Sequence, residues 1–225
     1  MKKSKFMVQD YPELIKYFAS VNPIHLFLYV LPVVLVISSV MNSYNMNFSV
    51  IFFLFGMIYW TFLEYLIHRY LYHSHFKNRI VNYFIGSFHL YHHANLKDHR
   101  VLNSGLLMIL IVAPTVVAPF LLFLNLSQVL SIMLGLSSFY YIYECVHYLI
   151  HYREYRSGYM AYIQKYHMQH HQHSPNKNFG NTSHIWDLLL GTYDPKYKEY
   201  RMSLKVKESL ITNSSKVFEG FQNNI

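Results

Sequence analysis

Histidine is the residue type in this sequence whose spacing is best suited to chemistry. The chain has 225 residues and 15 histidines, and ten of these histidines fall into two similar groups. In each group a histidine pair precedes the trio H-x2-H-H, and the pair is H-x4-H in the first group and H-x3-H in the second. One pair of histidines on a helix face is a weak signal, whereas the repeat predicts a polynuclear metal site. The ten residues are His68, His73, His89, His92, His93, His147, His151, His167, His170 and His171.

Ten imidazoles are more than one metal ion can use, because about four to six ligands saturate zinc or iron. We therefore expect two ions. Imidazole nitrogen suits iron, zinc and copper. Two redox-active ions held close together can activate dioxygen, so the predicted chemistry is oxidation of an unactivated C–H bond.

Two carboxylates precede the histidine pairs. Glu64 stands four residues before His68, and Glu144 stands three before His147. We expect each carboxylate to accept a hydrogen bond from an imidazole N–H of a ligand. The alternative is an ion pair with a cation at the membrane interface. His25 is expected to be an interfacial or packing residue. His75, His99 and His184 are expected to be loop residues or to contact a metal ligand from behind, and the role of His173 is open.

The composition indicates a membrane protein. Hydrophobic residues make up 53% of the chain and charged residues 13%, whereas soluble domains average about a quarter charged. No charged residue occurs in 17–63 or 101–143, and the basic residues fall into the blocks 2–16, 69–100 and 153–216. This is how a bilayer sorts charge, and it argues against a nucleic-acid-binding patch despite the net charge of +8. The single cysteine, Cys145, excludes an intrachain disulfide and a thiolate metal cluster.

Apolar stretches predict four transmembrane helices in an all-α fold, at 23–40, 48–67, 101–124 and 130–150. Each is close to the ~20 residues that cross a bilayer. Four spans place both termini and the 69–100 loop on one side, and their basic residues make that side cytoplasmic. Both histidine groups then form a cytoplasmic helical cap. We expect an N-terminal interfacial segment at 1–22, a membrane domain with the dimetal site at 23–205 and a C-terminal tail at 206–225.

The histidine motifs resemble those of the fatty acid hydroxylase superfamily, the integral-membrane group that includes sterol desaturases and fatty-acid 2-hydroxylases. The matching segments are EYLIHRYLYH at 64–73, HLYHH at 89–93, HYLIH at 147–151, HMQHH at 167–171 and NFGNTSHIWDLLLGTYD at 178–194. The resemblance implies that the ten histidines bind a dimetal centre, taken to be di-iron in catalysis, although zinc has been found in purified members. Within the last segment, Asp187 is a third candidate carboxylate behind the ligands.

The first box, H-x4-H, is more similar to the 2-hydroxylase branch than to sterol desaturases, which usually have H-x3-H-H. The resemblance therefore implies an O2-dependent lipid monooxygenase that hydroxylates a fatty acyl chain near its carboxyl end. Eukaryotic 2-hydroxylases often carry an N-terminal heme domain with a histidine–proline–glycine–glycine motif. This sequence lacks that motif, so we expect a separate electron-donor protein. The expected membrane is a bacterial inner membrane or the endoplasmic reticulum.

Other functions remain open from the sequence. Sterol or carotenoid hydroxylation or desaturation would use the same chemistry. A non-enzymatic polytopic metal transporter would also be rich in histidine, but its ligands should lie near the bilayer midplane. A bis-histidine heme protein would need facing histidines within the spans. The enzyme interpretation requires that the two histidine groups lie together in the folded chain.

Overall fold

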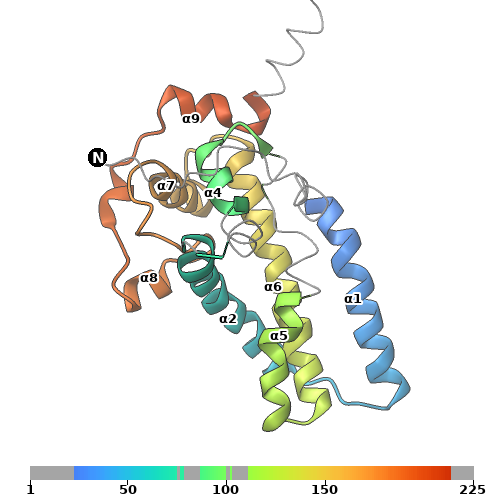
Figure 1. Cartoon of the computed structure of the whole chain (residues 1–225). Helices are drawn as coiled ribbons and strands as arrows, with labels where there is room; N and C mark the ends of the chain where they lie inside the picture. Colours follow the sequence, from blue (N-terminus) through green and yellow to red (C-terminus); the bar gives the residue numbers. More distant parts are fainter. Residues whose placement is uncertain (1–22, 75–76, 79–86, 100–101, 103–110, 214–225) are drawn as a thin grey trace, which may run out of the picture.

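The computed structural model describes residues 23–74, 77–78, 87–99, 102 and 111–213 (Figure 1). Helices, turns and loops make up this part of the chain, and no strand occurs within it, which confirms the all-α prediction. The predicted interfacial segment 1–22, residues 103–110 of the predicted third span and residues 214–225 of the predicted tail lie outside the described residues.

Four apolar segments form a bundle, in which α1, α2 and α5 each contact the central helix α6 (Figure 1). The elements are α1 (Pro23–Ser43), α2 (Val50–Leu66), α5 (Ala113–Val117) with the 3-10 turn η6 (Ala118–Leu122), and α6 (Leu126–Tyr152). A capping box fixes the start of α6, because Asn125 Oδ1 accepts from the Gln128 backbone N–H at 3.0 Å and the Gln128 side chain accepts from the Asn125 N–H at 3.1 Å.

Two helical stretches of the described chain are long and apolar enough to cross a membrane, Val50–Tyr72 and Leu126–Tyr152. The bundle also leaves large apolar side chains exposed along its length, including Leu35 and Val36 on α1 and Ile51 on α2. Such a surface suits lipid better than water. The helix predicted at 23–40 is present as α1, and the predicted third span is described only at residue 102 and from residue 111 onward.

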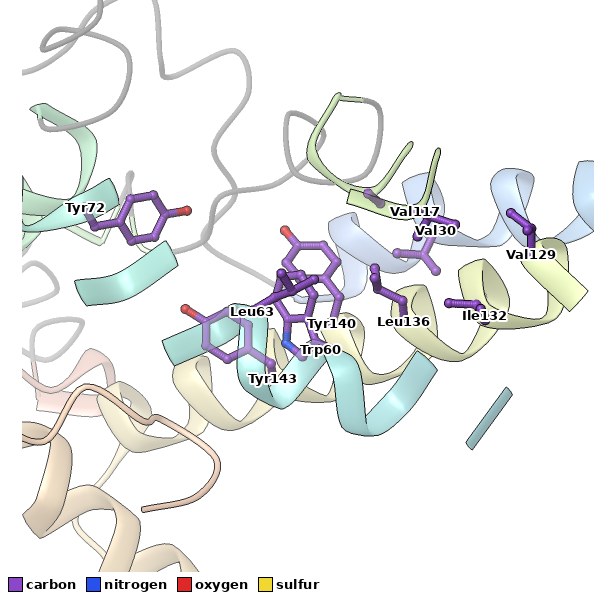
Figure 2. Packing of buried hydrophobic residues seen from close by; sticks show 11 residues of the cluster. Val30, Trp60, Leu63, Tyr72, Val117, Val129, Ile132, Leu136, Tyr140 and Tyr143 are labelled. Atoms are coloured by element: carbon purple, nitrogen blue, oxygen red, sulfur yellow. The ribbon is translucent and has the colours of Figure 1, made fainter. Parts of the chain in front are cut away.

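Glycine lets α2 and α6 cross closely. A Cβ atom added at Gly56 would lie 2.2 Å from the Ile132 carbonyl oxygen, and one added at Gly135 would lie 1.9 Å from the Phe53 carbonyl oxygen. Toward the other end of the crossing, Trp60 stacks edge-on against Tyr140 with ring centroids 4.8 Å apart (Figure 2). Close backbone contact at one end and interlocked aromatic rings at the other hold the two long helices in register.

The remaining helices form a cap over one end of the bundle (Figure 1). The cap consists of α4 (Ser87–Ala94), α7 (Gly158–Gln172), α8 (Ile185–Leu189), η7 (Pro195–Lys198) and α9 (Leu204–Ser209). At the same end, α2 continues into the π-helix η2 (Ile67–Tyr72). All ten histidines of the predicted site belong to η2 and its C-cap, α4, the last turns of α6, and α7.

Candidate metal centre

The π-helix explains the H-x4-H spacing of the first histidine pair. In an α-helix residues five apart point in different directions, whereas a π-turn bonds residue i+5 back to residue i. Here the His73 backbone N–H donates to the His68 carbonyl oxygen at 3.2 Å, so both imidazoles project from the same side. The sequence predicted the pair but not the π-turn that aligns it.

Helical geometry also explains how each H-x2-H-H trio divides its side chains. Positions i and i+4 differ by about 40° around an α-helix, whereas position i+3 lies about 60° away on the other side. The outer histidines of each trio therefore share a direction, and the middle histidine points elsewhere. His92 of α4 accordingly joins the histidines of α6 and α7, and His170 of α7 joins those of η2 and α4.

The first cluster contains five histidines whose ligand atoms all lie within 4.8 Å of one another: His68, His73, His89, His93 and His170. The Nε2 atom of His73 lies 3.2 Å from that of His89 and 3.2 Å from that of His170. The Nε2 atoms of His89 and His93 are 2.9 Å apart. Five rings from three elements thus direct the same nitrogen toward one point.

The second cluster contains four histidines that meet the same criterion: His92, His147, His151 and His167. The Nε2 atom of His167 lies 3.0 Å from that of His151 and 2.9 Å from that of His171. The ring of His171 also stacks on His93 of the first cluster, with centroids 3.9 Å apart. His171 therefore adds a fifth nitrogen to the second cluster and joins the two clusters through its ring face.

The residues present fit a pair of metal ions. Two imidazoles bound at ~2.0–2.1 Å from one ion place their nitrogens about 2.9 Å apart at a right angle and about 3.4 Å apart in a tetrahedron, which brackets the spacings above. The Nε2 atoms of His68, His92 and His147 are buried and have no hydrogen-bond partner among the described residues. A metal ion would satisfy these atoms, and leaving them bare would be costly.

Burial also keeps the imidazoles of the cap in their metal-binding form. It lowers the pKa of His89 and His167 well below the ordinary value of 6.5, and neighbouring imidazoles lower both further. Burial also lowers the pKa of His170, to about 4. These rings are therefore neutral at pH 7 and offer a free lone pair.

The loop that follows α7 fixes the orientation of three rings from behind. The Phe179 carbonyl oxygen accepts from His68 Nδ1, the Lys177 carbonyl oxygen accepts from His170 Nδ1 at 2.6 Å, and Asn181 Oδ1 accepts from His167 Nδ1 at 2.8 Å. Each contact places the ring proton on Nδ1 and turns Nε2 toward the clusters. The loop 177–181 thus acts on both clusters. Sequence reasoning missed the role of Asn181, although the segment itself stood out as a motif.

Glu64 and Glu144 have hydrogen-bond partners other than the imidazoles that the sequence suggested. Glu64 is buried and accepts from the backbone N–H of Asn181, from the backbone N–H of Thr182 at 2.9 Å and from the Thr182 hydroxyl at 2.6 Å. Glu144 is buried on α6 and hydrogen-bonds the Tyr140 hydroxyl. Glu64 therefore acts on the histidines indirectly, by holding the loop that orients them, and not through the direct imidazole contact that the sequence suggested.

Asp187 organises the same loop. Its carboxylate is fully buried and accepts from the backbone N–H groups of Phe179 at 2.9 Å and Gly180 at 2.8 Å, and from the Thr192 hydroxyl at 2.7 Å. The carboxylate thereby holds the residue whose carbonyl oxygen orients His68. Charge-assisted bonds of this kind are roughly twice as strong as neutral ones.

Of the other histidines, His99, His173 and His184 belong to neither cluster. The His99 Nε2–H donates to the Ser209 carbonyl oxygen at 2.8 Å, His184 Nδ1 hydrogen-bonds the Tyr162 hydroxyl at 2.5 Å, and the exposed His173 contacts the Tyr200 ring. His99 and His184 were predicted to be loop residues or to contact a metal ligand from behind, and the hydrogen bonds above join them to residues outside the two clusters. The side chain of His25 and all of His75 lie outside the described residues.

Comparisons with known proteins agree with this geometry. Residues 53–192 match the family described as fatty acid hydroxylase. A dihydroceramide fatty acyl 2-hydroxylase of Arabidopsis thaliana is 31% identical over 172 residues, which are 72% of this chain and 69% of the relative. A ceramide very long chain fatty acid hydroxylase of Schizosaccharomyces pombe is 30% identical over 71% of this chain and 47% of its own length.

A fatty acid 2-hydroxylase of Rattus norvegicus is 30% identical over 67% of this chain and 41% of its own length. The chain thus spans less than half of the yeast and rat relatives. Among solved structures, full-length scs7p, of which only the hydroxylase domain is visible, superposes with a TM-score of 0.69 at 26% identity. The superposition covers 86% of this chain and 73% of that chain.

Proposed function

Because this chain belongs to the fatty acid hydroxylase family, we propose that it is a membrane lipid monooxygenase acting on a fatty acyl chain. The plant and rat relatives are named as 2-hydroxylases of a dihydroceramide fatty acyl chain and of a fatty acid, and the Schizosaccharomyces pombe relative as a ceramide very long chain fatty acid hydroxylase. The proposed substrate is accordingly an acyl chain, free or in a sphingolipid-like lipid, hydroxylated next to its carboxyl carbon. These names favour an acyl chain over a sterol or a carotenoid.

The convergence of ten imidazoles on two adjacent points carries this proposal. The proposed ligands are His68, His73, His89, His93 and His170 for one ion, and His92, His147, His151, His167 and His171 for the other. The proposed ions are iron, with zinc as a substitute in purified protein. A bound iron pair would supply the activation of dioxygen and the oxidation of a C–H bond. A neutral, nitrogen-only ligand set leaves the two ions more positive than carboxylate ligands would.

The protein would position the metal-binding histidine rings and exclude water from the metal site. Carbonyl and amide oxygens of the loop 177–181 hold three rings with Nε2 inward, so the ligands need little rearrangement when the ions bind. Burial of the clusters under the cap keeps bulk water away from the reacting centre. In the overall reaction one oxygen atom of O2 enters the C–H bond and the other leaves as water. That balance requires two electrons and two protons, which we assign to a separate donor protein.

The proposed membrane arrangement has four spans, with the cap, both termini and the basic blocks on the cytoplasmic side. The two long apolar helices and the exposed apolar side chains of α1 support it. The proposed domain boundaries remain 1–22, 23–205 and 206–225. A metal-transporter function is disfavoured, since the histidines gather at one end of the bundle and in the cap.

Mass spectrometry of lipids from cells that express the protein, grown under labelled dioxygen, tests the proposal. We expect one labelled oxygen on an acyl chain, and we expect His170→Ala to abolish it and to lower the metal content of the purified protein. His173→Ala is the matched control, because this histidine lies at the end of the same helix and contacts Tyr200. It should retain both labelled product and metal.

Two results would contradict the proposal. One is the absence of any new oxygenated lipid from protein that is fully loaded with iron and supplied with a reductant. The other is full metal content and product in His170→Ala, which would separate the histidine clusters from the chemistry.

A further inference from the structure

The short helix α8 exposes an apolar surface that the metal centre does not explain. Leu188 is 59% exposed and Leu189 is 70% exposed, and Ile185 and Leu190 are also exposed. Contiguous exposed aliphatic residues on a protein surface commonly mark an interaction site. The polar residue of the helix, Asp187, is instead directed inward to the loop that orients the histidines.

The position of α8 along the bundle indicates what covers this surface. The Trp186 indole N–H donates to the Thr61 hydroxyl of α2 at 2.9 Å, and its ring contacts Phe62 with centroids 4.7 Å apart. Thr61 precedes His68 by seven residues, which is about 10 Å along a helix. Trp186 is therefore attached well inside the apolar stretch Val50–Tyr72. Figure 1 shows α8 at the lower edge of the cap, beside the upper half of α2.

Helix α2, which α8 contacts, also exposes apolar side chains. Below the attachment point, α2 exposes Leu54, Phe55 and Ile58, which are the side chains expected to face lipid. A helix attached to this face at this depth meets the same solvent as α2. A Trp anchor with its polar N–H satisfied and aliphatic side chains outward is the pattern of a helix lying in a membrane interface.

We propose that α8 inserts its outer face, formed by Ile185, Leu188, Leu189 and Leu190, into the acyl-chain region of the leaflet on the histidine side. The helix is rigidly joined to the metal centre, because Asp187 bonds Phe179 and Phe179 orients His68. The partner is thus the lipid leaflet. It would contact α8, the helix whose Asp187 holds the loop that orients His68 of the first cluster.

Leu204 of α9 provides a matched control. It lies at a comparable exposure of 74% on another short cap helix, but α9 lies on the far side of the cap from the bundle (Figure 1). The chain has one cysteine, Cys145, so Cys145→Ser gives a background in which single cysteines can be introduced. The variants are Leu188→Cys, Leu189→Cys and Leu204→Cys, each in the full chain reconstituted in phosphatidylcholine vesicles or nanodiscs.

Labelling with a membrane-impermeant maleimide and quenching of an attached fluorophore by brominated acyl chains test the proposal. We expect both α8 variants to label at least about tenfold more slowly than Leu204→Cys, and we expect only the α8 fluorophores to be quenched by bromolipid. Solubilisation in denaturant should equalise the labelling rates, and metal content reports whether each variant is folded.

Two outcomes would overturn the proposal. Equal labelling of all three folded variants would place α8 in water. Protection without bromolipid quenching would mean that protein covers the surface, and a loss of that protection on dilution into more nanodiscs would identify a second copy of the chain. Neither measurement depends on hydroxylation, so failure here leaves the proposed catalytic function standing.

Discussion

Asp187→Asn is the substitution that most directly tests whether the loop after α7 holds the metal ligands. The carboxylate accepts three hydrogen bonds within the buried loop, two of them from backbone N–H groups. Asparagine has nearly the same shape but replaces one acceptor oxygen with an NH2 group. The Oδ2 atom accepts from the Gly180 backbone N–H at 2.8 Å. An NH2 group at that position would place two hydrogen-bond donors against each other.

The expected cost follows from those contacts. One charge-assisted hydrogen bond is lost, the remaining two weaken, and a buried backbone N–H is left unpaired, so we expect a loss of about 2–4 kcal/mol. For a chain of this size that corresponds to a fall of roughly 4–16 °C in melting temperature. Because the loop orients His68 and His167, metal affinity should fall by roughly 10–100-fold.

Thermal melts of the metal-loaded protein in detergent and chelator competition measure the two effects. Glu154→Gln is the control, because it removes an exposed carboxylate of the same region that pairs with Lys207 at 2.9 Å. Exposed pairs contribute about 0–1 kcal/mol, so this variant should match the parent. If Asp187→Asn retained the melting temperature and metal affinity of Glu154→Gln, the loop would not be what orients the histidines.

Three further predictions follow from single contacts. Asn181→Ala removes the acceptor of His167 Nδ1, so one of the two ions should be released by chelator about 10-fold more readily than the other, as biphasic release would show. In metal-free protein, burial lowers the pKa of His170 to about 4, so the unfolded chain binds more protons below pH ~6.5. His170 alone lowers the free energy of unfolding by about 1.4 kcal/mol per pH unit from there to about pH 4, and denaturant melts should show at least this slope, because buried imidazoles such as His89 and His167 add to it. Gly135→Ala would place a Cβ atom 1.9 Å from the Phe53 carbonyl oxygen, so melts should show a loss of about 1–3 kcal/mol or more.

Apolar stretches and charge distribution were sufficient to predict three of the long helices. Uncharged apolar segments predicted helices at 23–40, 48–67 and 130–150, and the structure has α1, α2 and α6 at these places. These predictions succeeded because long apolar helices are specified locally, by composition over a window of about 20 residues. The full four-span arrangement stays a proposal, since the third segment is described only in part.

Spacing alone identified which histidines lie together, but not how they are divided between the two clusters. Each trio would have been assigned to its own half of the chain, whereas His92 and His170 each join the other half's cluster. The angle between positions i+3 and i+4 of a helix allows this exchange, but only the packing of α4 against α7 decides it. Each cluster therefore contains one ring from the other half of the chain.

The partner of Glu64 could not be predicted, because it lies 118 positions away in the sequence. A carboxylate four residues before a histidine on a helix suggested a direct bond, since that is the contact local geometry permits. The folded chain instead uses Glu64 to receive Asn181 and Thr182 at the buried end of α2. An unpaired carboxylate there would be costly, so docking of the loop satisfies Glu64 and at the same time positions Asn181 against His167. The carboxyl group that holds the loop against the bundle and the amide that orients His167 therefore meet at the same loop.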